Sequence, residues 1–305
     1  MDARIRWLVA AALFAAAGPL GAQSSLSVET QGGWAEWWRA DRAPRQCPST
    51  DPIVERAISW TGLTAGVERG ELRVAARRGL WKFRVVLARF DAARVRVTLV
   101  TAAGGAQAWT IDDAPANATI ALNAGQFTDA GVWGWLIRDG IEQQPPGYGP
   151  LSTAVTVDSS GAFRLVDFAD IDTVRARGRI VTAFQSYPTI LSGNGEVPAA
   201  LLASGRGVDL NHRDARLALC ELRSGRTLVA LTRFDTLDGA LGSAPFGPTV
   251  PEMSALMGAL GCVRAVMLDG GISAQLLLRT AAGRTQMWNG WRKVRLGLVV
   301  HAVAR

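Results

Sequence analysis

Residues 267–276 read Met-Leu-Asp-Gly-Gly-Ile-Ser-Ala-Gln-Leu. The apolar run from Val263 to Leu268 predicts a buried strand that ends abruptly at Asp269. Two glycines follow, and glycine lets the backbone take a positive φ and lets a ligand approach the main chain closely. A carboxylate beside exposed N–H groups and the Ser273 hydroxyl suits an oxyanion, a sugar hydroxyl or a metal. The structural alternative is a tight strand-to-helix turn capped by Ser273, and this stretch alone does not decide between them.

The chain from Ile58 onward shows mainly a strand pattern. Apolar and polar residues alternate with period two, most regularly from Arg94 to Val100, which is typical of a half-buried strand. Asp139-Gly140 predicts a tight hairpin turn between 134–138 and 140–142. We expect further hairpins from 151–157 to 162–166 and from 216–222 to 227–233, and more strand across 171–181.

Helices are predicted less often. Thr249 to Leu260 has apolar residues at helical spacing, with Thr249 as N-cap and Gly261 as C-terminal stop. Residues 273–279 form either a short helix or a strand. Many strands, few helices and no repeating βαβ pattern predict an α+β fold built on a mostly antiparallel mixed sheet.

The N-terminus resembles a secretory signal. Arg4 and Arg6 precede an apolar run, Trp7 to Ala17, that is too short to span a bilayer. We place cleavage after Ala22, with an uncleaved anchor as the alternative. Since no other segment approaches transmembrane length without charge, the mature protein is expected to be exported to the periplasm or outside the cell. The predicted organisation is a signal peptide (1–22), an N-terminal extension (23–57) and one catalytic domain (58–305).

Charge and cysteine content narrow the functional classes. The formal net charge is +7, but the arginines are scattered and form no basic run, so no nucleic-acid partner is expected. The excess arginine fits an anionic substrate or a GC-rich coding sequence. Cys47, Cys220 and Cys262 allow one disulfide, either between Cys220 and Cys262 or from Cys47 to the body. With two histidines and no CxxC spacing, no zinc site is expected.

Four polar clusters stand next to apolar strands, where loops carry function on a rigid scaffold. Each alone is also explained by an ordinary turn or by solvated charge. The motifs of serine hydrolases, metalloproteases and nucleotide-binding proteins are missing. The clusters are Asn123 to Asp129, Gln185 to Gly193, Asn211 to Arg216, and Asp269 to Ser273 with Glu252 on the preceding helix.

In this order the clusters resemble the motifs of the phosphodiester glycosidase family. Asn123 to Phe127 is similar to its Asn-Gly-Gly-Phe-Phe motif, with Ala124 and Gln126 as departures. Gln185 to Pro188 is similar to Gln-Ser-Gly-Pro, with Tyr187 in place of glycine. Leu268 to Ser273 is similar to Leu-Asp-Gly-Gly-Gly-Ser, with Ile272 in place of the third glycine. An arginine before a strand corresponds to Arg213 or Arg216, and the spacing leaves both open.

The resemblance implies a phosphodiester-glycosidase-like fold and hydrolysis of a sugar-1-phosphodiester, similar to an N-acetylglucosamine-1-phosphodiester, in a polysaccharide or glycolipid. Two acids flank the bond in the usual glycosidase scheme. Asp269 is the first candidate carboxylate, and Glu252 or Asp129 is the second. Arg213 and Arg216 are expected to hold the phosphate of this anionic substrate. The remaining candidates for substrate binding are Asn123, Gly125, Gln126, Gln185, Ser186, Gly270, Gly271 and Ser273.

No cofactor is required by this reading. Asp269, Asp129 and nearby carbonyls allow calcium or magnesium, but no ligand spacing demands either ion. The alternative function is a non-catalytic, exported carbohydrate-binding protein on the same fold. The eleven tryptophans of the chain fit stacking against sugars, although tryptophan packs equally well in a hydrophobic core. The sequence leaves the oligomeric state open.

Overall fold

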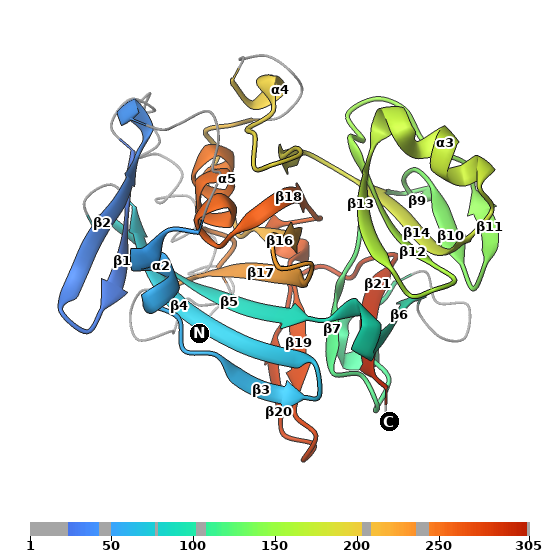
Figure 1. Cartoon of the computed structure of the whole chain (residues 1–305), viewed down its shortest axis with the longest axis horizontal. Coiled ribbons are helices and arrows are strands. Elements are labelled where there is room, and N and C mark those ends of the chain that lie inside the picture. The colour runs from blue at the N-terminus through green and yellow to red at the C-terminus, as the bar shows by residue number, and fades with distance from the viewer. Residues whose placement is uncertain are drawn as a thin grey trace, which may run out of the picture.

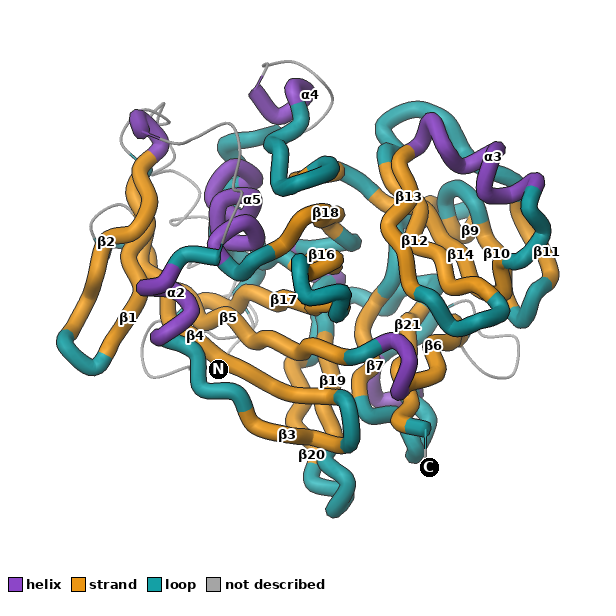
Figure 2. Tube along the Cα trace, in the orientation of Figure 1, coloured by secondary structure: helices purple, strands orange, loops and turns teal. Residues whose placement is uncertain are grey.

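The computed structural model describes residues 24–42, 50–76, 79–101, 108–202, 209–235 and 244–303. Strands dominate these residues and the helices are short (Figure 2). Neighbouring strands in the described sheets run antiparallel, as the sequence predicted. The expected signal peptide and Cys47 lie outside the described residues.

The largest sheet has nine strands and forms the middle of the molecule (Figure 1). The described part of the predicted N-terminal extension joins it, because β1 pairs with β4 and β2 pairs with β1. The strands in spatial order are β15 (Thr189–Leu191), β18 (Cys262–Met267), β16 (Leu217–Leu222), β17 (Thr227–Phe234), β5 (Trp81–Phe90), β4 (Val67–Ala76), β1 (Ser25–Thr30) and β2 (Gly33–Arg39), with β3 (Thr61–Thr64) also on β4.

Two five-stranded sheets and one small hairpin complete the β structure. One sheet has the order β11 (Ile141–Gln144), β10 (Leu136–Arg138), β14 (Ile180–Ser186), β12 (Thr153–Asp158) and β13 (Phe163–Asp167). The other has the order β20 (Thr285–Trp288), β19 (Leu276–Arg279), β7 (Ile120–Asn123), β21 (Gly297–Ala302) and β6 (Val95–Val100). The hairpin pairs β8 (Phe127–Thr128) with β9 (Gly131–Val132).

The nine-stranded sheet is apolar on both faces and so separates two cores. Along β5, Val85 and Leu87 pack into one core while Val86 and Ala88 pack into the other, because successive side chains of a strand point to opposite faces. The first core lies under α5 (Val250–Ala259). The second core joins the sheet to both five-stranded sheets. The predicted alternation of β6 is confirmed, since its Val95, Val97 and Leu99 belong to this second core.

The hairpins predicted across Asp139-Gly140 and at 151–166 and 216–233 are confirmed. The helix predicted at 249–260 is also confirmed as α5, with Thr249 as its N-cap. The other described helices are α2 (Pro52–Arg56), α3 (Ile171–Ala176) and α4 (Ala199–Leu202). None of the described helices is long and apolar enough to cross a membrane.

Two expectations for local structure need correction. Strand was expected across 171–181, but α3 occupies its first part and strand begins only at Ile180. The helix is favoured over a strand here because it turns Ile171 and Val174 to the same side, where both cover the outer face of the β14 sheet. Residues 273–279, for which helix and strand stayed open, contain the end of a 3-10 turn (Gly271–Ser273) followed by β19.

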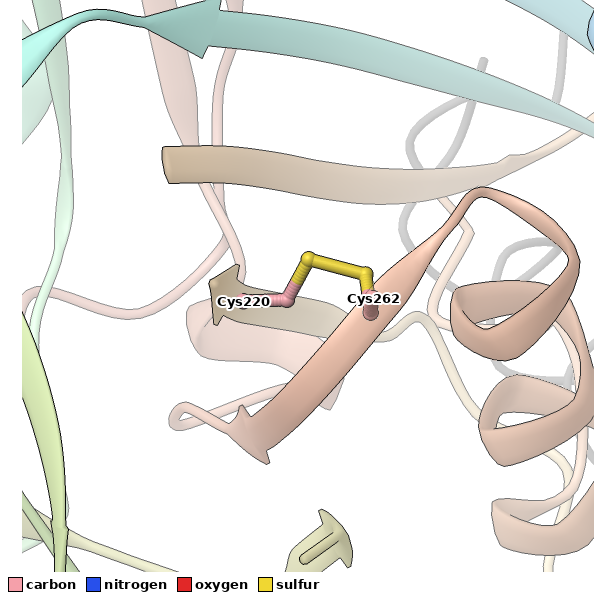
Figure 3. The surroundings of a disulfide bond; sticks show 2 residues. All are labelled: Cys220 and Cys262. Carbon is pink, nitrogen blue, oxygen red and sulfur yellow. A yellow bond between two sulfur atoms is a disulfide. The ribbon is translucent and has the colours of Figure 1, made fainter. Parts of the chain in front are cut away.

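A disulfide joins Cys220 of β16 to Cys262 of β18 (Figure 3). Both cysteines are buried in the core beneath α5. The bond closes a segment with a sequence separation of 42 residues. Of the two pairings that the sequence left open, the structure therefore has the one between Cys220 and Cys262.

Because a cross-link of this length restricts the unfolded chain, replacing Cys220 and Cys262 together by alanine should lower the free energy of unfolding by about 2–4 kcal/mol. Urea unfolding measures the loss. A reductant should destabilise the wild-type protein by a similar amount and leave the double variant unaffected. Equal stability of the oxidised and reduced wild-type protein would contradict this.

Candidate active site

The turn after β18 is shaped by close contact with the segment that precedes β16. Gly271 has a φ of +59°, and a Cβ added there would lie 2.7 Å from Asp214 Oδ2. A Cβ at Gly270 would lie 2.8 Å from the Ala215 carbonyl oxygen, which accepts a 2.7 Å hydrogen bond from Gly271 N. Both glycines are therefore required by this packing. Ile272 is 44% exposed, so its side chain is accommodated where the family motif has a third glycine.

Asn123 braces this turn. It is the last residue of β7 and is fully buried. Its Nδ2 donates a 2.6 Å hydrogen bond to the Asp269 carbonyl oxygen, and its Oδ1 accepts a 2.9 Å bond from Gln275 N. Both ends of the amide are thus engaged within the protein. The geometry gives Asn123 the role of positioning Asp269 rather than contacting a sugar.

The end of β14 meets the same turn from another sheet. Ser186 Oγ lies 2.6 Å from the Met267 carbonyl oxygen and 2.9 Å from Gln126 Oε1. Gln126 Nε2 donates to the Tyr187 carbonyl oxygen at 3.0 Å. A Cβ at Gly125 would lie 2.2 Å from the Gln185 carbonyl oxygen, so only glycine fits at this crossing. These expected substrate-binding residues hold the loops of the site together.

Gln185 also serves the scaffold. Its side chain is fully buried, and its Oε1 accepts hydrogen bonds from Trp135 N at 2.6 Å and Gly147 N at 2.7 Å. Its Nε2 donates to the Gly147 carbonyl oxygen at 3.2 Å. The amide thereby fastens two neighbouring loops, and it is fully buried rather than open to a sugar.

Glu252 has a structural environment that sequence reasoning did not anticipate. It is fully buried, caps α5 by accepting from Thr249 N at 3.0 Å, and also accepts from Ser24 Oγ. Arg213 binds both of its oxygens, at 2.7 and 2.8 Å. This pair neutralises itself inside the fold. We therefore place neither Glu252 among the reacting acids nor Arg213 on the phosphate.

Arg216 is likewise committed to the fold. Nε donates to the Pro248 carbonyl oxygen at 3.0 Å, and Nη2 donates to the His212 carbonyl oxygen at 2.5 Å. Burial lowers the pKa of Arg216, and the carboxylate of Asp214 is the strongest of the groups that oppose this. Arg216 acts as a buried counter-charge to Asp214 and is not positioned as an open phosphate contact.

Asp269 and Asp214 form the electrostatic centre of the site. Burial raises the pKa of Asp269, and the negative charge of Asp214 raises it further, against the Ser273 hydroxyl and Arg292, which lower it. Burial also raises the pKa of Asp214, against the charges of Arg216 and His212. Burial thus acts on both carboxyl groups in the same direction, towards the protonated form.

Asp214 is the main residue that the sequence analysis missed. It stands within the cluster Asn211 to Arg216 that the analysis singled out, but its arginines were preferred there. The signal that could have found it is its place directly before β16, the neighbour of β18 in the sheet. In that position it faces the residues that follow β18.

Arg292 is the second missed residue. It is exposed, its guanidinium lies 4.7 Å from the ring centroid of Phe127, and its charge lowers the pKa of Asp269. Asp129, the other expected acid, is exposed in the turn between β8 and β9, and its carbonyl oxygen accepts from Arg295 at 3.1 Å. Among the described residues, no group of three or more His, Cys, Asp and Glu side chains is arranged to hold a metal ion.

Residues 116–301 match the phosphodiester glycosidase family. Since this match covers more than half of the chain, the protein belongs to that family, as its motifs suggested. No curated protein matches the sequence at a significant level.

Solved structures share the fold at low sequence identity. The catalytic domain of zebrafish N-acetylglucosamine-1-phosphodiester alpha-N-acetylglucosaminidase, auto-inhibited by its pro-peptide, is 15% identical and aligns with a TM-score of 0.61 over 81% of this chain and 88% of that one. A hypothetical protein from Synechocystis is 15% identical, with a TM-score of 0.57 over 93% of this chain and 69% of that one. A putative exported protein from Burkholderia pseudomallei has a TM-score of 0.48, with 14% identity over 97% of this chain and 89% of that one. At these identities the likeness to the first two structures establishes the α+β fold, which agrees with the prediction.

The raised pKa of Asp269 predicts how its removal changes stability with pH. A folded-state pKa above the unfolded value means that the ionised carboxylate destabilises the fold once the pH exceeds both values. Asp269→Asn should therefore be more stable than wild type at pH 7. The difference should shrink as the pH falls through the folded pKa and vanish below about 4, the usual aspartate value.

Urea unfolding of both proteins across this pH range measures the effect. Asp139→Asn is the matched control, because Asp139 is exposed in a hairpin turn and asparagine tolerates its φ of 53°. A stability difference between Asp269→Asn and wild type that stays constant with pH would contradict the prediction.

Proposed function

We propose that this protein is an exported glycosidase that hydrolyses a sugar-1-phosphodiester, similar to an N-acetylglucosamine-1-phosphodiester, in a polysaccharide or glycolipid. The observation that carries the proposal is the placement of two carboxyl groups, Asp269 and Asp214, where the ends of β18 and β16 meet. A Cβ added at Gly271 would lie 2.7 Å from Asp214 Oδ2, and burial raises the pKa of both acids. Membership of the phosphodiester glycosidase family supports the same reaction class. The family enzyme with a solved structure is named for an N-acetylglucosamine-1-phosphodiester, which supports the choice of sugar.

The pair suits the proton transfers of this hydrolysis. The bond between the anomeric carbon and the phosphate oxygen breaks, and the oxygen of a water molecule bonds to that carbon. One carboxyl group gives its proton to the departing phosphate oxygen, and the other, ionised, accepts a proton from the water or stabilises the positive charge of the sugar. Burial favours the protonated form of each carboxyl group, so one protonated and one ionised member would supply both roles. These steps require no cofactor.

Arg292 is the proposed phosphate contact in place of Arg213 and Arg216. It is exposed, near enough to Asp269 to lower its pKa, and packed against Phe127. A guanidinium bonds two phosphate oxygens at once and offsets the charge that develops on the leaving group. In this position, beside Asp269, Arg292 can contact the phosphate that leaves the anomeric carbon.

Export is supported by two features. The N-terminal sequence has the charge and apolar pattern of a secretory signal. The disulfide between Cys220 and Cys262 is the kind of bond that persists in oxidising compartments outside the cytosol.

Asp269→Asn and Asp214→Asn should each lower kcat by about 100-fold or more, because each removes one proton-transfer or charge-stabilising group. Release of free sugar from UDP-N-acetylglucosamine and from methyl N-acetylglucosamine-1-phosphate measures turnover, and urea unfolding checks that both variants fold. Asp139→Asn should keep wild-type turnover. Full activity in either active-site variant would remove that residue from the mechanism. Sugar binding by the wild-type protein without any product would favour a carbohydrate-binding protein instead.

Arg292→Ala should lower kcat/KM for the phosphodiester by about 10- to 100-fold, the effect expected for one hydrogen-bonded charge. Arg284→Ala makes the same change of charge at an exposed turn between β19 and β20 and should have no effect. Steady-state kinetics with methyl N-acetylglucosamine-1-phosphate compares them. Equal values for the two variants would assign the phosphate to another group.

A further inference from the structure

Four aromatic side chains form a row that starts at the candidate active site. Tyr187 and Trp133 have ring centroids 5.7 Å apart, and Tyr148 and Phe168 have centroids 6.0 Å apart. The backbone next to Tyr148 approaches the first pair, because a Cβ added at Gly149 would lie 3.9 Å from the Trp133 ring. We call Tyr187, Trp133, Tyr148 and Phe168 the aromatic row.

Tyr187 connects the row to the reacting acids. It follows β14 directly, and its carbonyl oxygen accepts from Gln126. Gln126 Oε1 accepts from Ser186 Oγ, which also donates to the carbonyl oxygen of Met267 at the end of β18. The charge of Asp269 reaches the Tyr187 hydroxyl and, after burial, is a further cause of its raised pKa. The row is therefore continuous with the site of the proposed reaction.

The row opens to solvent as it leaves the acids. Tyr187 and Trp133 are half-buried, Phe168 is 40% exposed and Tyr148 is 79% exposed. Such exposure is unusual for neighbouring aromatic side chains that only pack a core, and clustered exposed rings mark binding surfaces. Next to Tyr148, the Arg175–Glu142 ion pair supplies hydrogen-bonding groups.

The backbone beneath the row is fixed. Through Trp135 N and Gly147 N, the buried Gln185 amide holds the two segments that carry Trp133 and Tyr148. Gly134 and Gly147 also touch, because a Cβ at Gly147 would lie 2.8 Å from the Gly134 Cα. Because the segments that carry the rings are already fixed, they lose little conformational freedom when a ligand binds.

We propose that the aromatic row binds successive sugar units of an extended glycan whose phosphodiester-linked unit lies at Asp269. The inference rests on the proposed function and makes its substrate a chain of several sugars. The C–H face of a pyranose packs against an aromatic ring while its hydroxyls stay in water or bond polar neighbours, as the Arg175–Glu142 pair allows. A row that ends at the acid pair suits such a chain better than a single sugar.

The test measures binding of glycans of increasing length by titration calorimetry. The probes are N-acetylglucosamine oligomers and cello-oligosaccharides of one to six units. In at least one series the affinity of the wild-type protein should rise tenfold or more between one and four units. The double variant Tyr148→Ala/Phe168→Ala should lose this dependence on length. Trp34→Ala, which removes a ring of 40% exposure on β2, should keep it.

The outcome separates this inference from the proposed function. Asp269→Asn should bind the long oligomers as wild type does, even though it is expected to lose turnover. Length-dependent binding by a wild-type protein that releases no sugar from methyl N-acetylglucosamine-1-phosphate would end the proposed function and leave the glycan row standing. Absence of length-dependent binding in both series, or its survival in the double variant, would overturn the row. Dimerisation in solution that the double variant abolishes would assign the rings to protein contact instead.

Discussion

The site depends on the hydrogen bonds that tie three sheets together at the end of β18. Asn123, from the β7 sheet, holds the Asp269 carbonyl, and Ser186, from the β14 sheet, lies against the Met267 carbonyl. The third sheet is the one to which β18 itself belongs. Buried backbone carbonyls need partners, so each of these bonds stabilises the fold and also fixes the loop that carries the acid. Both side chains are fully buried, whereas Asp214, Arg292 and Tyr187 are more open and are the residues that we propose for contact with substrate.

Much of the fold follows from local patterns in the sequence. The period-two alternation of β6, the Asp139-Gly140 turn and the cap of α5 each need only neighbouring residues, so each was predictable. Which face a residue occupies is harder to predict for the interior strands, since β17 is buried on both faces and its sequence shows no alternation of polar and apolar residues. The segment at Ile171 could not be predicted from local pattern, because its packing on the β14 sheet favours a helix although the local sequence favours a strand.

For the site, the sequence identified the loops better than the residues within them. It selected the four clusters that the structure brings together, but side-chain direction decided which members reach Asp269. Glu252 illustrates the limit, since Thr-x-x-Glu at a helix start is also the pattern of a capping box, and the structural reading is the one observed. Arg213 is largely buried because it forms an ion pair with Glu252. Asp214 lies between the two arginines in the sequence, but a role in the site was predicted only for the arginines.

The disulfide between Cys220 and Cys262 has a consequence for alignment as well as for stability. It links the strands that precede Asp269 and follow Asp214, in a region where Ala218 lies opposite Met267. Sliding one strand past its neighbour by a single residue would turn every side chain to the other face. A covalent tie between these two strands forbids such slippage. It acts as a register lock that holds the strand ends carrying the two acids in one alignment.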